Sequence, residues 1–185
     1  KANELYEKIN SEFGMAVTSG NLGALLINFK SYTNSLKYSK KAKNLYEKLD
    51  YKRYVAYPIS NIAVVYDSLH QFEEANKNYI ESIALHEKFE NNYELSNSCN
   101  AFSNCLIKQK KYKESIIYAE KALKFAQNAD AYFLVVGAHA NLAKAYGKME
   151  IFDKAYYYSN LYNKGMDSLF KTEKTKAVFE IEAKY

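Results

Sequence analysis

The strongest constraint on this chain is a sequence pattern that repeats every forty residues. Residues 1–10 read KANELYEKIN and residues 41–50 read KAKNLYEKLD, and six of these ten positions are identical. Self-similarity at a fixed period of this length is the signature of a repeat protein, in which each unit buries its core against the next. Only six Gly and one Pro occur in 185 residues, which disfavours an all-β fold with many tight turns.

Four blocks of the repeat, beginning at residues 16, 56, 96 and 136, share five columns of similar residues. Positions seven and eleven are large: Leu22, Ile62, Phe102 and Leu142, then Leu26, Tyr66, Leu106 and Tyr146. Positions eight and twenty are small: Gly23, Ala63, Ser103 and Ala143, then Ser35, Ala75, Ser115 and Ala155. Position seventeen is always aromatic: Tyr32, Phe72, Tyr112 and Phe152. The helical period places positions seven, eight and eleven on one face, and the small columns allow two antiparallel helices to approach closely.

This spacing resembles the tetratricopeptide repeat, and the resemblance covers essentially the whole chain. The best copies read Asn61-Ile62-Ala63-x-x-Tyr66 leading to Phe72-Glu73-Glu74-Ala75, and Asn141-Leu142-Ala143-x-x-Tyr146 leading to Phe152-Asp153-Lys154-Ala155. The resemblance implies an all-α fold of the α-α superhelix class, a right-handed solenoid of antiparallel helix hairpins. Its forty-residue variety is similar to the repeats of bacterial sensor histidine kinases and helix-turn-helix regulators.

The sequence also departs from that family pattern. The usual period is about 34 residues, and the familiar Pro after the second helix is absent. Tyr162 stands where the earlier blocks have the small residues Ala42, Ser82 and Ala122. A forty-residue period also fits repeats of the HEAT kind. The twelve-residue gap between the two small columns favours the tetratricopeptide interpretation.

The register predicts where the helices and the repeat boundaries lie. First helices are expected near 12–29, 52–69, 92–109 and 131–149, and second helices near 33–49, 72–89, 112–127 and 152–168. We expect one array over 1–185, as a fragment of a longer protein. Its parts are a half-repeat at 1–10, repeats at about 12–50, 51–90, 91–130 and 131–170, and the start of a further helix at 171–185.

Helix ends and one internal position can also be predicted. Asn10, Asp50, Asn91 or Asn92, and Asp130 precede the expected first helices and are good N-cap residues. Pro58 is expected inside a long helix that it bends. If that helix began near residue 57 instead, Pro58 would be a first-turn residue.

Catalytic and metal-binding patterns are absent from the sequence. It contains no Gly-rich phosphate loop, no His-Glu-x-x-His, no Cys-x-x-Cys and no nucleophile elbow. His70, His86 and His139 fall in three different columns, so one is expected in a turn and two are expected to be partly buried. Cys99 and Cys105 are too far apart on one helix for a disulfide, and Cys99 occupies a packing column. We therefore expect no enzyme activity, no cofactor and no metal.

Charge and hydropathy disfavour nucleic acid and membrane as partners of this chain. The net charge of +5 comes from interleaved basic and acidic residues, whereas nucleic-acid binders concentrate basic residues on one face. No stretch approaches the roughly 20 apolar residues that span a bilayer. The chain carries 19 Tyr, with a cluster at 156–158 and at 162, and this excess fits either a protein interface or a compositional bias.

By the resemblance, the first helices line a concave groove that binds a protein or peptide. The residues predicted to bind are Tyr57, Ser60, Asn61, Asp67, Asn100, Asn104, Lys108, Asn141, Lys144 and Lys148. Such a groove is polar and becomes basic toward its later end, which suits a peptide that bears an acidic group. The Lys-and-Asn carboxylate clamp of the chaperone-binding members is not matched, because only Asn104 agrees with it. Asn21, Asn61 and Asn141 share a column, and an alternative role for them is to bond to neighbouring backbone.

The sequence favours two functions. The first is a binding scaffold. The second is a sensory or regulatory region of a membrane-tethered bacterial sensor kinase or transcriptional regulator, suggested by residues 169–185, which resemble the start of the signalling helix in those proteins. The second interpretation places the repeats in the periplasm, and otherwise they are expected in the cytoplasm.

Overall fold

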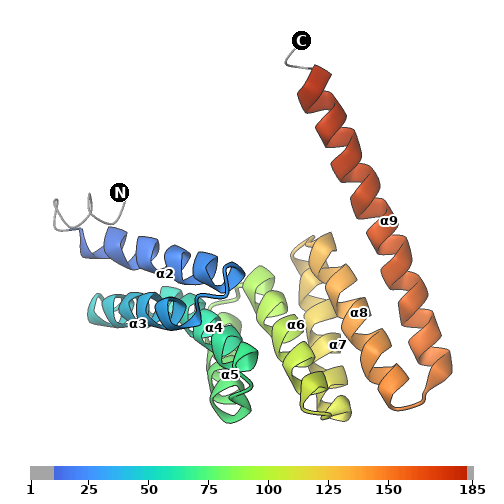
Figure 1. Cartoon of the computed structure of the whole chain (residues 1–185), viewed down its shortest axis with the longest axis horizontal. Helices are drawn as coiled ribbons and strands as arrows, with labels where there is room; N and C mark the ends of the chain where they lie inside the picture. The colour runs from blue at the N-terminus through green and yellow to red at the C-terminus, as the bar shows by residue number, and fades with distance from the viewer. Residues whose placement is uncertain (1–10, 183–185) are drawn as a thin grey trace. The chain divides into compact units, whose positions relative to one another are not determined.

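The computed structural model describes residues 11–182, which form a succession of α-helices without strands in that range (Figure 1). The first helices of the hairpins are α2 (Glu12–Asn28), α4 (Lys52–Ser68), α6 (Asn92–Lys108) and α8 (Tyr132–Lys148). The second helices are α3 (Tyr32–Lys48), α5 (Phe72–Lys88), α7 (Tyr112–Asn128) and α9 (Phe152–Glu182). The predicted all-α class and the predicted order of helices are confirmed. The half-repeat at 1–10, its Asn10 cap and the last three residues lie outside the described residues.

The chain forms two compact units, residues 1–98 and 99–185, which divide within α6. In the first unit α2 packs on α3, α4 packs on α5, and α4 also contacts α2 and α3. In the second unit α8 packs on both α7 and α9. The first helices α4 and α8 therefore each contact their own hairpin partner and the preceding hairpin of the same unit.

The small columns lie where the two helices of a hairpin meet. The Ser35 hydroxyl donates to the Gly23 carbonyl at 2.8 Å, and the Ser103 hydroxyl donates to the Ser115 carbonyl at 2.9 Å. Both bonds join residues twelve apart, the gap that favoured the tetratricopeptide interpretation. Direct contact between side-chain hydroxyl and backbone requires the helix axes to be close, and larger residues would hold them apart.

Every turn between helices is built in the same way. Seven non-glycine residues twenty positions apart have φ between 51° and 62°: Lys30, Asp50, His70, Glu90, Lys110, Asp130 and Glu150. The residue after each of them donates its N–H to the carbonyl five positions earlier, as in Ser31 to Leu26 at 2.9 Å and Ile151 to Tyr146 at 3.0 Å. This is the Schellman motif, which satisfies the last carbonyls of the preceding helix.

The turn geometry corrects two predicted N-caps. Asp50 and Asp130 are the left-handed residues of their turns, and the N-cap positions belong to Tyr51 and Ala131, whose side chains make no capping bond. Asp tolerates the left-handed region better than most residues, which explains its place one position earlier. The Asn91 prediction is confirmed, because its side-chain oxygen accepts from the Glu94 N–H at 3.4 Å.

Two further helix predictions have different outcomes. Pro58 lies in the interior of α4, as expected from the register. The predicted end of a helix near residue 168 is wrong, because α9 continues without a break for 31 residues to Glu182. The twenty-residue spacing would place the next turn at Phe170, and a bulky aromatic residue is poorly suited to positive φ. No helix among the described residues is long and apolar enough to cross a membrane.

Candidate functional site

The predicted binding residues of the first unit are largely engaged with neighbouring helices. The Asn91 amide donates to the Tyr57 hydroxyl at 2.8 Å, and the Ser60 and Ser98 hydroxyls lie 3.1 Å apart. The Asn61 amide donates to the Gly20 carbonyl at 3.2 Å. Tyr57, Ser60 and Asn61 therefore join α4 to α2 and to the start of α6.

Asp67 lies near the end of α4 and is buried, with 5% of its surface exposed. A carboxylate at that depth does not present itself to a ligand on the surface of this structure. Of the four α4 residues predicted to bind, Tyr57, Ser60, Asn61 and Asp67, only Asp67 is fully buried.

In the second unit, two of the predicted residues link α6 to α8. The Asn100 amide donates to the Leu134 carbonyl at 2.9 Å. The Asn141 amide donates to the Asn100 carbonyl at 3.0 Å, and its nitrogen also lies 3.3 Å from the Asn100 side-chain oxygen. Asn141 thus repeats the contact of Asn61, since each donates to a carbonyl 41 positions earlier on the preceding first helix. The alternative role predicted for this Asn column, bonding to neighbouring backbone, is confirmed for these two residues.

The remaining predicted residues of the second unit lie at or near the surface. Lys108, Lys144 and Lys148 are exposed, and Asn104 is half-buried. The basic end of the predicted groove is therefore the part of it that is accessible in this unit.

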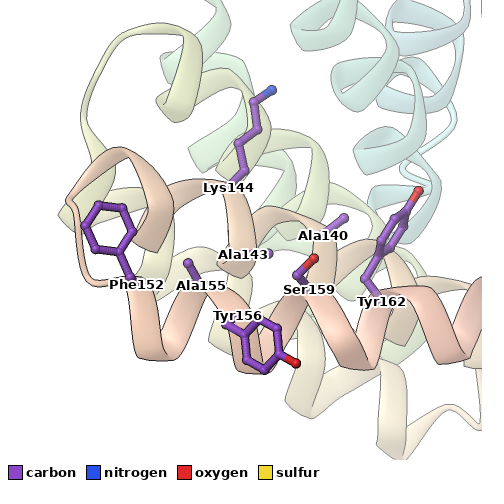
Figure 2. Close-up of a pocket in the computed structure, with 8 residues that line it drawn as sticks. All are labelled: Ala140, Ala143, Lys144, Phe152, Ala155, Tyr156, Ser159 and Tyr162. Atoms are coloured by element: carbon purple, nitrogen blue, oxygen red, sulfur yellow. The ribbon is translucent and has the colours of Figure 1, made fainter.

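A pocket of about 690 Å³ opens between α8 and α9 (Figure 2). It is lined by Ala140, Ala143 and Lys144 of α8 and by Phe152, Ala155, Tyr156, Ser159 and Tyr162 of α9. Figure 2 shows the small side chains between the two helices, with Lys144 and the three aromatic rings extending around them. Phe152 and Tyr156 are 69% and 72% exposed, so the wall of the pocket presents two large rings to solvent.

Only part of this pocket was predictable from the sequence. Lys144 was predicted as a binding residue, whereas the aromatic wall on α9 was missed as a site. The available signal was the tyrosine cluster at 156–158 together with Tyr162, the one large residue in an otherwise small column. Aromatic side chains such as Tyr and Phe are enriched at protein interfaces, so this wall of the pocket is a candidate binding surface.

Both cysteines and His86 are buried in the core, whereas the other two histidines are not. His70 lies in a turn, His139 is half-buried, and His86 is buried with 1% of its surface exposed. Burial lowers the pKa of His86 to about 4 and also lowers the pKa of His139, because the charged imidazolium loses its hydration. Cys99 and Cys105 are buried free thiols. Within residues 11–171, no three His, Cys, Asp or Glu side chains gather closely enough to hold a metal ion.

Comparison with known proteins agrees with this architecture. Residues 14–88 match the family model described as a tetratricopeptide repeat. No curated protein matches the sequence.

Three solved structures share the fold at low sequence identity. The aspartyl phosphate phosphatase F structure from Bacillus subtilis has a TM-score of 0.81 at 18% identity, over 98% of this chain and 47% of that one. The BtubC structure from P. vanneervenii gives 0.73 at 16% identity, over 86% and 66%. The apo form of RapI gives 0.55 at 14% identity, over 92% and 82%.

This chain spans about two thirds and about half of the length of the first two of these proteins. The likeness extends the fold beyond the matched segment, since it covers most of this chain in all three. The fold is that of helical repeat proteins of the α-α superhelix class, and residues 14–88 of this chain match the tetratricopeptide repeat model.

Proposed function

We propose that this chain is a scaffold that binds a protein or peptide and that does not itself catalyse a reaction. The observation that supports this most is the open pocket between α8 and α9, in which exposed aromatic rings surround small residues beside Lys144. Large rings that remain exposed are costly in water and become favourable when a partner covers them.

The basic residues of the first helices give this partner its proposed charge. Lys108, Lys144 and Lys148 are exposed, and the half-buried Asn104 can offer an amide to a peptide backbone. An acidic side chain or a C-terminal carboxylate is the complementary group. Asn100 and Asn141 hold α6 and α8 together, so within the proposed groove they fix the spacing of the surface and need not bind the ligand themselves.

The test is the binding of peptides selected from a random display library against the whole chain. We expect selected peptides to be enriched in Asp and Glu, and the triple variant Lys108→Ala, Lys144→Ala and Lys148→Ala to weaken their binding at least about tenfold by calorimetry. The matched control removes the same charge from exposed lysines of the second helices, through Lys113→Ala, Lys124→Ala and Lys164→Ala. An equal loss of affinity in both triple variants would show that only the net charge matters, and it would contradict the proposed binding surface.

The absence of catalysis is tested separately. Because the same fold occurs in a protein named aspartyl phosphate phosphatase, hydrolysis of a small acyl phosphate is the relevant assay. We expect no release of phosphate above the uncatalysed rate. Turnover that survives repurification would show that the chain is more than a scaffold.

A second proposed function is a sensory or regulatory region that signals through its C-terminal helix. One observation favours it: α9 is 31 residues long, whereas each of the other described helices has 17. A helix that leaves its hairpin can carry a change in packing away from the repeats. We then expect binding of a selected peptide to change amide hydrogen exchange in 171–182, and unchanged exchange there would remove this candidate.

A further inference from the structure

The pocket between α8 and α9 lies on a face that a helix covers in the preceding hairpin. Tyr156 and Ser159 of α9 occupy the same repeat positions as Ile116 and Ala119 of α7, forty residues earlier. Ala119 is fully buried and Ile116 packs against the same cluster, which includes Leu142 and Tyr146 of α8. In α9 the corresponding Tyr156 is 72% exposed. Among residues 11–182, no helix covers the surface of the fourth hairpin that corresponds to the one receiving α8 in the third.

A repeated hydrogen bond shows how a helix is aligned on this face. The Asn61 amide of α4 donates to the Gly20 carbonyl of α2, and the Asn141 amide of α8 donates to the Asn100 carbonyl of α6. Both carbonyls belong to position five of their block. The equivalent residue of the fourth block is Ala140, which lines the pocket.

Two residues make this face different from the earlier ones. Tyr162 replaces Ala42, Ser82 and Ala122, which are all fully buried. In the first unit, Ala42 lies in one cluster with Val55 and Ile59 of the following first helix. A tyrosine at that place leaves no room for two branched side chains opposite it. Lys144 replaces Asn104 and adds a positive charge to the rim.

We infer that the α8–α9 pocket binds an amphipathic α-helix of a partner protein, which bears an Asn, an acidic residue and small residues at defined positions. The Asn donates to the Ala140 carbonyl, the acidic residue lies one turn later and pairs with Lys144, and the small residues face Tyr162. The inference rests on the proposed scaffold function and names the kind of partner. Residues 171–182 of the chain do not supply this helix, because they continue α9 without a turn.

Two helix-stabilised peptides based on α8 provide the probes. Val135 and His139 are the residues of α8 that correspond to Val55 and Ile59, eighty positions earlier. The first peptide has the sequence of residues 132–148 with Ala145→Glu, which places an acid one turn after Asn141. The second peptide additionally carries Val135→Ala and His139→Ala, so that it is small where it faces Tyr162.

Binding of both peptides to the whole chain is measured by fluorescence anisotropy. We expect the second peptide to bind at least about tenfold tighter than the first, and Tyr162→Ala to reduce this preference below about twofold. Tyr156→Ala should weaken the second peptide about tenfold. Tyr157→Ala is the matched control, because Tyr157 is an exposed ring of α9 outside the pocket, and it should leave binding unchanged. Circular dichroism melting confirms that each variant is folded.

Several outcomes would overturn the inference. Equal binding of the two peptides, or no effect of Tyr156→Ala, would show that the pocket does not select a helix in this way. Sedimentation that reveals self-association of the chain, abolished by Tyr156→Ala, would assign the face to a second copy. If neither peptide binds while the display-selected peptides still depend on the three lysines, only the helix inference fails and the proposed scaffold function remains.

Discussion

At the scale of single residues, two glycines lie where α2 packs on α3. Gly23 and Gly20 lie three positions apart in α2 and both face α3, yet their surroundings differ. A Cβ on Gly23 would lie 3.2 Å from the Ser39 backbone nitrogen and would overlap the Ser39 hydroxyl, whereas a Cβ on Gly20 would meet the Ala42 Cβ at 3.7 Å. The first distance requires backbone to move, and the second is ordinary contact.

We therefore predict opposite effects of the same substitution at these two glycines. Gly23→Ala should lower the free energy of unfolding by about 1–3 kcal/mol, because overpacking outweighs the gain in helix propensity. Gly20→Ala should raise it by up to about 1 kcal/mol, since Ala favours the helix and fits the space. Urea denaturation measures both, and a destabilised Gly20→Ala variant would contradict the packing described for α2 and α3.

His86 makes stability depend on pH. Its imidazole is buried, packs edge-on against Tyr57 with ring centroids 5.3 Å apart, and its Nε2 has no hydrogen-bond partner. The pKa of about 4 in the folded chain lies below the ordinary 6.5, so the unfolded chain binds the proton first as pH falls. The contribution of His86 to stability is complete above pH 6.5 and is lost progressively between pH 6.5 and 4.

We predict that His86→Leu removes this part of the pH dependence. The difference in unfolding free energy between the original chain and the variant should shift by up to about 3 kcal/mol in favour of the variant from pH 7 to pH 4. Denaturation at a series of pH values measures it. Parallel curves for the two proteins would show that His86 is hydrated or paired in solution.

At the scale of helices, the recurring Asn-to-carbonyl bonds align one hairpin on the next. We predict that Asn61→Ala and Asn141→Ala each lower the unfolding free energy by about 1 kcal/mol, the usual net value of a hydrogen bond. Asn21→Ala is the internal control, because Asn21 occupies the same column but is exposed on α2. Similar losses at all three positions would mean that the column stabilises each helix locally and does not join hairpins.

The continuous α9 leads to a second prediction at this scale. Phe170 stands at the next place in the twenty-residue series of turns but remains helical. Phe170→Gly should favour a break there, because Gly enters the left-handed region without steric cost and weakens the helix by about 1 kcal/mol. Faster amide exchange in 171–182, with unchanged exchange in 152–165, is the expected result. Uniform exchange along α9 in the variant would show that other contacts hold the helix straight.

Most helix ranges and turns were predictable from the sequence, and the exceptions have physical causes. The helix ranges follow from the apolar and small columns, since those residues can only be buried in one register. The turns were placed one residue off at Asp50 and Asp130, because a left-handed residue and an N-cap favour the same short polar side chains. The length of α9 was missed because a repeat register predicts a turn at 170 whether or not Phe170 can adopt it.

The candidate site was less predictable than the fold. A column that is small in three blocks and occupied by Tyr162 in the fourth indicates that packing differs in the last hairpin. It does not indicate which residues lie against Tyr162. Asn61 and Asn141 were weighed both as ligand contacts and as structural residues, and only coordinates could show the carbonyls to which they donate. Exposure of Phe152 and Tyr156 depends on which helix follows, which single-sequence patterns do not state.

At the scale of the whole molecule, the charge of +5 and its exposed lysines determine how proposed partners are attracted. We predict that binding of an acidic display-selected peptide weakens by about tenfold between 50 and 500 mM salt, because ions screen charges at the surface. The Lys108, Lys144 and Lys148 triple variant should show a clearly flatter dependence, and the Lys113, Lys124 and Lys164 control should keep the original slope. Salt-independent binding would point to the aromatic wall as the dominant contact.

The seven identical turns have a consequence for how such a gene can change length. Their geometry depends on a backbone bond pattern that Lys, Asp, His and Glu all adopt, so a cut at one turn joins in phase to the equivalent turn forty residues away. Duplicating or deleting 120 nucleotides between equivalent turns would therefore add or remove one complete hairpin while its neighbours keep their own contacts. Recombination can lengthen or shorten the protein in whole hairpins, and selection then acts on which faces are left uncovered.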